Sequence, residues 1–548
     1  MSALPLLANA VTVAGAAPAR ARFAAALRDP ARAQREILQR ALRAGRESAY
    51  GRAHGFAAIR HAADFAERVP LVTFDDLAPW IDRVAGGEAG VLTRAPVRFM
   101  EPTGGSSGYR KLVPYTSGLL AEFSAATMPW LFDLLTHRPA LARGRAYWAI
   151  TPPARAPART PGAIPVGMQD DADYFPAPLR ALLRRTLAVP ASVALARDVA
   201  TCRHLSLLAL LGATDLALMS VWSPSFLSTL AAALDEGWER LLRDLERGAP
   251  GVPLPRAIAS RLRRDLPARP DVARSLRARF GARPPEDLGL VWTRLALVSC
   301  WTEGHAARAL SAVRARFPRV EIQGKGLLAT EGVVSIPLFG ASAPAAAVTS
   351  HYLELLDPRD GRAVPIHAAD AGGTYEVALT TGGGLYRYRL RDLVRVEGRL
   401  HATPLLSFQG RADRASDLAG EKLTPALAER AIADAVRATG VDAPFAMLAP
   451  VFAPEPHYRL YAQATAAGAG ELAAAVDREL RRAHHYALCR SLGQLGAVRG
   501  VPVLDAHRVY ERACAERGQR AGAIKPPALE CAPGWERVFE DEPEPVLR

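Results

Sequence analysis

Lysine is almost absent from this sequence. Only four of its 69 basic residues are lysines, namely Lys111, Lys325, Lys422 and Lys525. An ammonium group is a compact point charge, whereas a guanidinium is planar and broad, so lysine suits a tight phosphate pocket that arginine does not fit. A lysine kept against this bias marks a candidate site, although four chance survivors of a biased composition would give the same count.

Cysteine is also scarce. The five cysteines are scattered along 548 residues without a CxxC pair or another metal-ligand spacing. This usage argues against a disulfide framework and is typical of a reducing compartment, so we expect a cytoplasmic protein. No apolar run is long enough to cross a membrane, and the apolar segment Met1 to Ala17 lacks the basic start of a signal peptide.

Several functional signatures are missing as well. The sequence has no Walker A motif, no GxGxxG and no HExxH, which argues against P-loop, dinucleotide-binding and zinc protease functions. The net charge of +14 is compatible with nucleic acid binding. However, acids are interspersed among the arginines of the helical segments and no long block of like charges occurs. Solvated helix faces are therefore favoured over a nucleic-acid surface, and the charge is also compatible with small anionic ligands.

The most distinctive stretch is a loop rich in glycine and hydroxyl groups that ends in a lysine. It runs Thr103-Gly104-Gly105-Ser106-Ser107-Gly108-Tyr109-Arg110-Lys111. Glycines let the backbone approach a ligand closely, and successive N–H groups and hydroxyls in such a turn form a concave donor surface for phosphate oxygens. Lys111 adds a mobile positive charge. An ordinary surface loop has the same composition, so the loop alone leaves both interpretations open.

Apolar spacing around this loop predicts an α/β body. Strands are expected on both sides of the loop, at 96–100 and 111–115. A long apolar helix is expected at 117–135, bent or interrupted at Pro129. Another strand is expected at 290–300. These elements indicate an α/β fold.

The apolar period changes to two after Glu331, which predicts an antiparallel, β-barrel-like sheet added to the α/β body. Together these parts form a large N-terminal domain, residues 1–415. A small α+β domain is expected at 416–548, with a helix at 470–486. The polar segment 411–422 lies where the two domains should meet.

Three further segments carry polar groups in a glycine-rich or strand-end context. Thr330 and Glu331 follow a predicted strand end, where a carboxylate can hold Mg²⁺ beside a phosphate or can simply cap a turn. Asp392 ends the stretch Tyr386 to Asp392, and can accept hydrogen bonds from ribose hydroxyls or pair with a neighbouring arginine. Lys525 lies on a glycine-flanked loop near the C-terminus. Lys325 has no assignable catalytic role.

Taken in this order, the segments resemble the adenylate-forming enzymes. Within that superfamily they are most similar to the Gretchen Hagen family of acyl acid-amido synthetases, in its bacterial branch. The resemblance extends over nearly the whole chain, through Tyr50-Gly51-Arg52, Val69-Pro70-Leu71, Thr103 to Thr116, Gly324 to Pro337, Gly384 to Val394 and Gly518 to Pro527. Leu327, Arg391 and Arg110 depart from the family pattern, where an aromatic residue (in the plant branch), a glycine and a frequent proline stand.

The resemblance implies that the large domain, residues 1–415, binds ATP and the acyl group, and that the small domain, residues 416–548, moves about the hinge segment 411–422. It also implies roles for individual residues in binding ATP and Mg²⁺. The ATP phosphates would be held by the loop residues Thr103, Gly105, Ser106, Ser107, Gly108 and Lys111. Thr330 and Glu331 would lie at the α-phosphate, with Glu331 also binding Mg²⁺. Tyr352 would lie near adenine, and Asp392 would bind the ribose. Lys422 and Lys525 would neutralise charge during catalysis.

The resemblance also implies a reaction in two steps. A carboxylate attacks the α-phosphate of ATP to give acyl-AMP and pyrophosphate, and an amine, expected to be that of an amino acid, then displaces AMP to give an amide. Negative charge gathers on the α-phosphate in the first step, so metal, lysines and N–H donors supply the catalysis. The alternatives are an acyl-CoA ligase of the same superfamily and a non-catalytic nucleotide-binding protein. We expect a monomer without nucleic acid or membrane partners.

Overall fold

The protein was analysed through a computed structural model. It describes residues 4–102, 111–148, 158–167, 182, 184–196, 198–248, 250–252, 254, 256–303, 306, 309–357, 360–412, 416, 418–419, 421, 423–452, 455–492, 494–517, 519, 524–531 and 534–540. The predicted phosphate-loop residues from Thr103 to Arg110 and the predicted catalytic Lys422 lie outside the described residues.

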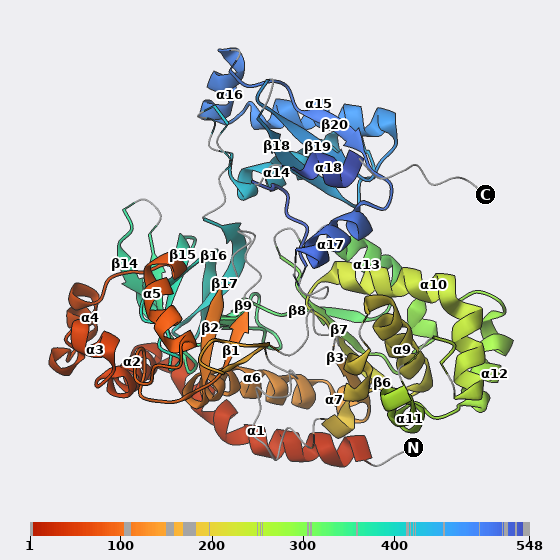
Figure 1. Ribbon diagram of the computed structural model, residues 1–548, viewed down its shortest axis with the longest axis horizontal. Helices are drawn as coiled ribbons and strands as arrows, with labels where there is room; N and C mark the ends of the chain where they lie inside the picture. The colour runs from red at the N-terminus through yellow and green to blue at the C-terminus, as the bar shows by residue number, and fades with distance from the viewer. Residues whose placement is uncertain are drawn as a thin grey trace. The chain divides into compact units, whose positions relative to one another are not determined.

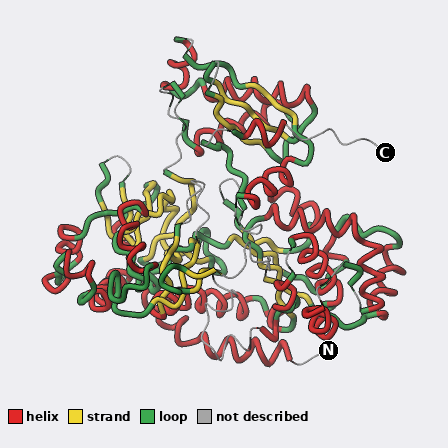
Figure 2. The backbone as a smooth tube through the Cα atoms, viewed as in Figure 1, coloured by secondary structure: helices red, strands yellow, loops and turns green. Residues whose placement is uncertain are grey.

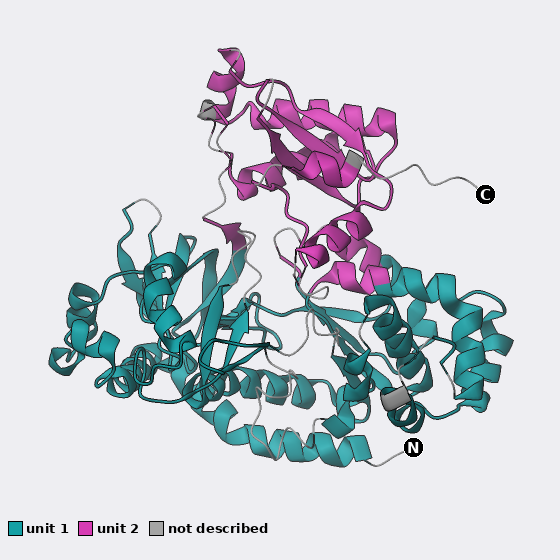
Figure 3. Cartoon of the chain, viewed as in Figure 1, with its two compact units in different colours: residues 1–222, 230–301, 315–408 teal, residues 223–229, 302–314, 409–548 magenta. Residues whose placement is uncertain are grey.

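The chain divides into two compact units (Figure 3). Unit 1 comprises residues 1–222, 230–301 and 315–408, and unit 2 comprises residues 223–229, 302–314 and 409–548. The break after Phe408 comes a little before the boundary expected at 415/416. Two short segments that were expected in the large domain belong to unit 2, so the domain limits 1–415 and 416–548 stay a prediction.

Helices dominate the first 320 residues (Figure 1). They are α1 (Leu4–Arg28), α2 (Pro30–Gly45), α3 (Ala49–Ala53), α4 (Ala62–Arg68), α5 (Phe74–Ala85), α6 (Ser117–His137), α7 (Pro139–Ala142), α9 (Val199–Gly212), α10 (Pro224–Arg247), α11 (Arg256–Asp265), α12 (Pro270–Phe280) and α13 (Leu310–Arg316). None of the described helices is both long and apolar enough to cross a membrane.

Helix α6 runs through Pro129 without interruption, contrary to one of the two expected outcomes. Proline has no backbone N–H, so the carbonyl four residues earlier loses its usual helical donor. That carbonyl belongs to Ala125, and the Thr349 hydroxyl donates to it at 3.3 Å. A side chain from another element therefore supplies the hydrogen bond that Pro129 removes. The helix can continue because its exposed carbonyl is satisfied.

A four-stranded parallel sheet lies in the α/β part of unit 1, in the order β3-β6-β7-β8. Its strands are β3 (Arg145–Trp148), β6 (Leu216–Ser220), β7 (Leu297–Cys300) and β8 (Glu321–Gly324). The strand expected at 290–300 is wrong in its first half. Residues Leu288–Leu290 form a short 3-10 helix, and the Trp292 indole donates to the carbonyl of Leu210 at 2.8 Å, so Trp292 packs on a helix and not within the sheet.

A second sheet brackets the predicted phosphate loop. β1 (Val97–Pro102) and β2 (Leu112–Thr116) pair antiparallel, with Pro102 opposite Leu112, so the two ends of the loop are adjacent. β5 (Pro165–Val166) pairs with β1, and β4 (Ala158–Arg159) pairs with β5. The strands expected on both sides of the loop are confirmed within two residues.

The expected antiparallel sheet is also present, with seven strands in the order β11-β12-β17-β16-β15-β13-β14. They are β11 (Ser335–Ile336), β12 (Ala345–Ala346), β13 (Tyr352–Leu356), β14 (Ala363–Pro365), β15 (Thr374–Thr380), β16 (Tyr388–Leu400) and β17 (Thr403–Arg411). Apolar side chains of this sheet share one core with α2, α5 and α6. The sheet therefore belongs to the same packed body as the loop strands β1 and β2.

Unit 2 holds a three-stranded sheet of β18 (Ala446–Val451), β19 (His457–Ala462) and β20 (Arg499–Pro502) with helices packed against it (Figure 2). The helices are α14 (Pro425–Thr439), α15 (Ala466–Leu480), α16 (His484–Ser491), α17 (Ala506–Glu516) and α18 (Trp535–Glu540). The single helix expected at 470–486 is two helices, because the chain turns between Leu480 and His484.

Candidate active site

The carboxyl ends of the parallel strands meet at one edge of their sheet. β6 is followed closely by Trp222, β7 by Trp301 and β8 by Lys325. In open α/β sheets, ligands bind in the crevice beyond the carboxyl ends of the strands. This edge is therefore where the fold favours a binding site.

Thr330 and Glu331 form the turn of a tight hairpin just beyond β8. β9 (Leu328–Ala329) and β10 (Gly332–Val333) pair antiparallel, with Ala329 opposite Gly332, which leaves only these two residues at the tip. Both residues are partly exposed. The hairpin thus presents a hydroxyl and a carboxylate together on a constrained backbone.

Two tyrosines hold this turn. The Tyr115 hydroxyl donates to the backbone carbonyl of Thr330 at 2.6 Å, and the Tyr388 hydroxyl donates to Glu331 Oε1 at 3.4 Å. Tyr115 is fully buried and stacks on Phe99 with ring centroids 4.8 Å apart. The strand that leaves the phosphate loop is therefore tied directly to the Thr330–Glu331 turn.

Lys111 stands at the start of β2, at the end of the predicted phosphate loop. Its ammonium lies 5.3 Å from the ring centroid of Phe74, an arrangement in which the ring face attracts the cation. The side chain is half-buried. Since Tyr115 lies on β2, the strand that directly follows Lys111, this lysine and the Thr330–Glu331 turn belong to one connected part of unit 1.

Asp392 lies on β16 and is buried to 6% exposure. Two arginines close to Asp392 in sequence, Arg389 and Arg391, both pair with Glu376, at 2.6 and 3.8 Å. Arg391 has a φ of +63°, and the pairing of β15 with β16 shifts register at this point. A residue with left-handed backbone angles at a β-bulge changes the direction of the strand. Glycine adopts such angles without strain, which explains why the family that the sequence resembles has glycine at the position of Arg391.

Tyr352 lies on β13 inside the core, with 5% of its surface exposed. Its ring packs edge-on against Phe65 at 6.0 Å between centroids, and burial raises the pKa of its phenol. Little of the ring is left for stacking on a base. The adenine contact of Tyr352 stays a prediction, and its burial counts against it.

The donor set fits a magnesium ion that is shared with phosphate. Among the described residues no group of three or more His, Cys, Asp or Glu side chains could form a complete metal site. Mg²⁺ in nucleotide sites takes one or two carboxylates from the protein and its remaining ligands from phosphate and water. Glu331, partly exposed and oriented by Tyr388, offers one such carboxylate.

Two family models match the chain. The model of the GH3 family N-terminal domain matches residues 19–322, which is more than half of the chain, and the model of the GH3 family central domain matches residues 345–411. The chain belongs to the GH3 family. This is the Gretchen Hagen family to which the sequence segments pointed.

Curated relatives of this GH3 chain include plant proteins of moderate identity. The probable indole-3-acetic acid-amido synthetase GH3.12 of Oryza sativa subsp. japonica is 28% identical over 433 residues, which cover 70% of each chain. The indole-3-acetic acid-amido synthetase GH3.2 of Arabidopsis thaliana is 24% identical over 460 residues, covering 75% of this chain and 79% of the plant protein.

Among solved structures, the GH3.15 acyl acid amido synthetase has a similar fold. It matches with a TM-score of 0.82 over 95% of both chains at 18% sequence identity. This likeness confirms the α/β fold expected from the sequence. Because the sequence identity is only 18%, this likeness bears on the fold alone.

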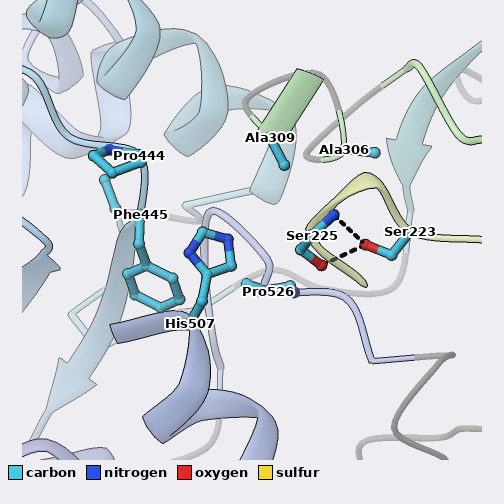
Figure 4. Close-up of a pocket in the computed structure, with 9 residues that line it drawn as sticks. Ser223, Ser225, Ala306, Ala309, Pro444, Phe445, His507 and Pro526 are labelled. Atoms are coloured by element: carbon cyan, nitrogen blue, oxygen red, sulfur yellow. Dashed lines mark hydrogen bonds between the residues drawn. The ribbon is translucent and has the colours of Figure 1, made fainter. Parts of the chain in front are cut away.

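The remaining predicted lysine of the GH3 chain, Lys525, lies in unit 2. It is partly buried, and Pro526 after it lines a pocket with Phe445 and His507 (Figure 4). The His507 ring packs edge-on against Phe445 with centroids 5.2 Å apart, and burial lowers the pKa of His507 to about 4. A neutral, enclosed histidine therefore lies beside the loop that carries Lys525.

Sequence reasoning on the GH3 chain missed the two tyrosines that organise the turn. Tyr115 was interpreted only as a strand residue and Tyr388 only as part of a strand end. Their hydroxyls contact residues 215 and 57 positions away, so no local pattern reveals the contacts. The one available signal was their place, since each lies within a segment that carries the family resemblance.

Proposed function

We propose that this GH3 chain is an ATP-dependent acyl acid-amido synthetase. It converts a carboxylic acid to acyl-AMP with release of pyrophosphate, and then transfers the acyl group to the amine of an amino acid, forming an amide. The observation that carries the proposal is the match of the family models over residues 19–322 and 345–411, together with the Thr330–Glu331 turn tied to β2 and β16.

Each step of adenylation has residues suited to it. The loop residues Thr103, Gly105, Ser106, Ser107 and Gly108 with Lys111 bind the phosphates. The Thr330 hydroxyl donates to the α-phosphate. Glu331 holds Mg²⁺, which when bound offsets charge on the phosphates. Asp392 accepts hydrogen bonds from the ribose, an assignment that rests on the family resemblance.

Lys422 and Lys525 keep the roles that the family resemblance implies, which is neutralising negative charge as the acid oxygen bonds to phosphorus. No protein nucleophile is required. The carboxylate oxygen forms the new P–O bond, and pyrophosphate leaves with the electron pair of the broken bond. In the second step the amine nitrogen bonds to the acyl carbon, the bond from that carbon to the bridging oxygen breaks, AMP leaves with this oxygen and its electron pair, and the amine releases a proton to water.

The chain is also proposed to come from the bacterial branch of the family and to act in the cytoplasm as a monomer. Leu327, in place of the aromatic residue of the plant branch, supports the first point. The proposed cytoplasmic location rests on the cysteines, all five of which are free of disulfides.

A pyrophosphate-release screen tests the function. Panels of carboxylic acids are offered with MgATP and either amino acids or CoA, and products are identified by mass spectrometry. We expect acid-dependent pyrophosphate and an amide with at least one amino acid. Release accelerated by CoA but not by amino acids would instead establish an acyl-CoA ligase. A folded protein that binds ATP and releases no pyrophosphate with any acid would establish a non-catalytic nucleotide-binding protein.

A further inference from the structure

Lys325 has an unusual setting for which the adenylation step gives no role. Its ammonium donates to the Ser220 hydroxyl at 2.7 Å and lies 5.1 Å and 5.7 Å from the ring centroids of Trp222 and Trp130. Indole is the ring that attracts cations most strongly. The side chain is half-buried, so part of its hydration has been replaced by aromatic surface.

The surrounding contacts fix this arrangement. The Trp130 indole N–H donates to Gln323 Oε1 at 3.2 Å, which sets the face that the ring turns to the ammonium. The backbone N–H of Trp301 donates to the carbonyl of Trp222 at 2.9 Å, and the two indoles lie 5.5 Å apart. The positive charge therefore sits in a preorganised aromatic wall at the carboxyl edge of the parallel sheet.

We propose that Lys325 binds the second carboxylate of a dicarboxylic acid whose first carboxylate is adenylated. This inference rests on the proposed function and names the class of its acid substrate. The reacting carboxylate attacks the α-phosphate at the Thr330–Glu331 turn, five residues further along the chain, while the second carboxylate stays ionised and unchanged. The indole rings of Trp222 and Trp130 contact the hydrocarbon between the two groups.

Pairing with the Lys325 ammonium affects the two carboxylates of such an acid differently. Ion pairing with an ammonium draws electron density from a carboxylate oxygen and makes it a weaker nucleophile. Such pairing would slow the attack of the reacting carboxylate, but it costs nothing at a carboxylate that does not react. A partly buried ammonium also discriminates strongly between dicarboxylic and monocarboxylic acids. The uncharged end of a monocarboxylic acid would leave the ammonium without an anionic partner. Lysine, rare in this chain, places a point charge where arginine would fill the space between the rings.

The test compares dicarboxylic acids from succinate to suberate with monocarboxylic acids of the same carbon number. Pyrophosphate release with MgATP and an amino acid mixture gives kcat/KM for each acid, and the specificity ratio is taken at the best chain length. We expect the wild-type ratio to favour the dicarboxylate at least tenfold. Lys325→Met lowers the ratio by about 10- to 100-fold, since a hydrogen bond to a charged group contributes about 1.5–3 kcal/mol.

The loss falls on KM and leaves kcat of the dicarboxylate nearly unchanged, because the second carboxylate is held equally in the ground and transition states. Lys325→Arg, which keeps the charge, restores part of the ratio. Arg138→Met is the matched control. The Arg138 guanidinium lies 5.3 Å from the Phe339 ring centroid and pairs with Glu321, at the opposite end of β8 from Lys325. This substitution therefore also removes a cation beside an aromatic ring, and we expect it to leave the specificity ratio unchanged.

Two results overturn the inference and leave the proposed function standing. One is a wild-type preference for monocarboxylic acids. The other is an equal loss of kcat/KM for dicarboxylic and monocarboxylic acids in Lys325→Met. That result would mean that Lys325 acts at the reacting carboxylate or only stabilises the fold. Absence of pyrophosphate with every acid overturns the proposed function itself, and the inference with it. Melting temperatures of the variants within a few degrees of wild type confirm that each is folded.

Discussion

Single side chains set the geometry of the Thr330–Glu331 turn. Tyr388 brings its hydroxyl to the Glu331 carboxylate, and Tyr115 brings its hydroxyl to the backbone of Thr330. Arg387 secures the strand that carries Tyr388. Its guanidinium is buried, pairs with Glu354 at 3.0 Å and donates to the carbonyl of Val69 at 2.8 Å. The arginines of this segment thus pair with carboxylates within the sheet, whereas Tyr388 orients Glu331.

Tyr388→Phe removes the hydroxyl that orients Glu331. We expect kcat/KM for acid-dependent pyrophosphate release to fall about tenfold, because a hydrogen bond to a charged group contributes at least about 1.5 kcal/mol. Tyr375→Phe is the control, since the Tyr375 hydroxyl accepts a hydrogen bond from the backbone N–H of Asp370 at 3.2 Å, away from the residues of this turn. Equal rates for the Tyr388 variant and wild type would contradict the role of the phenol.

Arg391 carries backbone strain beside Asp392. A non-glycine residue at φ +63° costs about 1 kcal/mol or more. Its partly exposed pair with Glu376, at 3.8 Å, offsets only part of this. Arg391→Gly and Arg391→Ala both lose the pair, but only glycine relieves the strain. We expect the glycine variant to have the higher free energy of unfolding by about 1 kcal/mol in urea denaturation. The opposite order would show that the position is not strained.

At the scale of elements, the β9–β10 hairpin depends on the absence of one side chain. A Cβ at Gly332 would lie 2.8 Å from Nε2 of the buried His351. The imidazole cannot yield easily, because its Nδ1 lies 3.0 Å from the buried Glu122 carboxylate. The hairpin can therefore sit over His351 only with glycine at this position.

Gly332→Ala is expected to lower the free energy of unfolding by about 1–3 kcal/mol, the usual cost of overpacking. Gly15→Ala, in the middle of α1 with no atom within 4 Å of the added Cβ, is expected to raise it by about 0.5–1 kcal/mol. Chemical denaturation of both variants measures the difference. A Gly332 variant as stable as wild type would mean that His351 moves freely.

The sequence predicts elements better than contacts, for physical reasons. Period-two alternation and glycines identified the antiparallel sheet, because burial of one face imposes that pattern locally. Pro129 suggested a bend, but Thr349 satisfies the orphaned carbonyl from 224 residues away. Trp292 suggested a strand, but its indole pairs with a helix carbonyl. The hydroxyls of Tyr115 and Tyr388 were missed for the same reason, since long-range hydrogen bonds leave no periodic trace.

At the scale of the whole molecule, unit 2 holds a buried histidine that makes its stability depend on pH. In unit 2, burial lowers the pKa of His507 to about 4, against about 6.5 for an exposed histidine. The folded unit keeps His507 neutral, while the unfolded chain takes up a proton once the pH falls below about 6.5. Stability from this group is thus present at neutral pH and is lost as pH falls from about 6.5 towards 4.

The expected loss reaches about 3 kcal/mol at pH 4, from a shift of about 2.5 pKa units. The loss is measured by urea denaturation of the full-length protein at pH values between 7 and 4. Hydrogen exchange of the α17 amides reports the midpoint of the transition for this helix. His507→Asn, which does not titrate, should flatten the dependence between pH 6.5 and 5. A midpoint for α17 that is independent of pH in the wild-type protein would contradict the burial of a neutral histidine.

We propose that Lys525 of unit 2 acts in catalysis, a role that stays a prediction. We expect Lys525→Ala to lose adenylation by at least 100-fold and to bind ATP nearly as well as wild type, because the lysine acts on charge that develops in the transition state. Calorimetry measures ATP binding and pyrophosphate release measures adenylation. Equal losses in both would place Lys525 in nucleotide binding and not in catalysis.

Acid-dependent exchange of labelled pyrophosphate into ATP tests the central claim most directly. It reports formation of acyl-AMP alone, before any amine is required. We expect exchange with MgATP and a dicarboxylic acid in the absence of amino acid, and loss of that exchange in Glu331→Gln. A folded, ATP-binding protein that shows no exchange with any carboxylic acid would contradict the proposed adenylation.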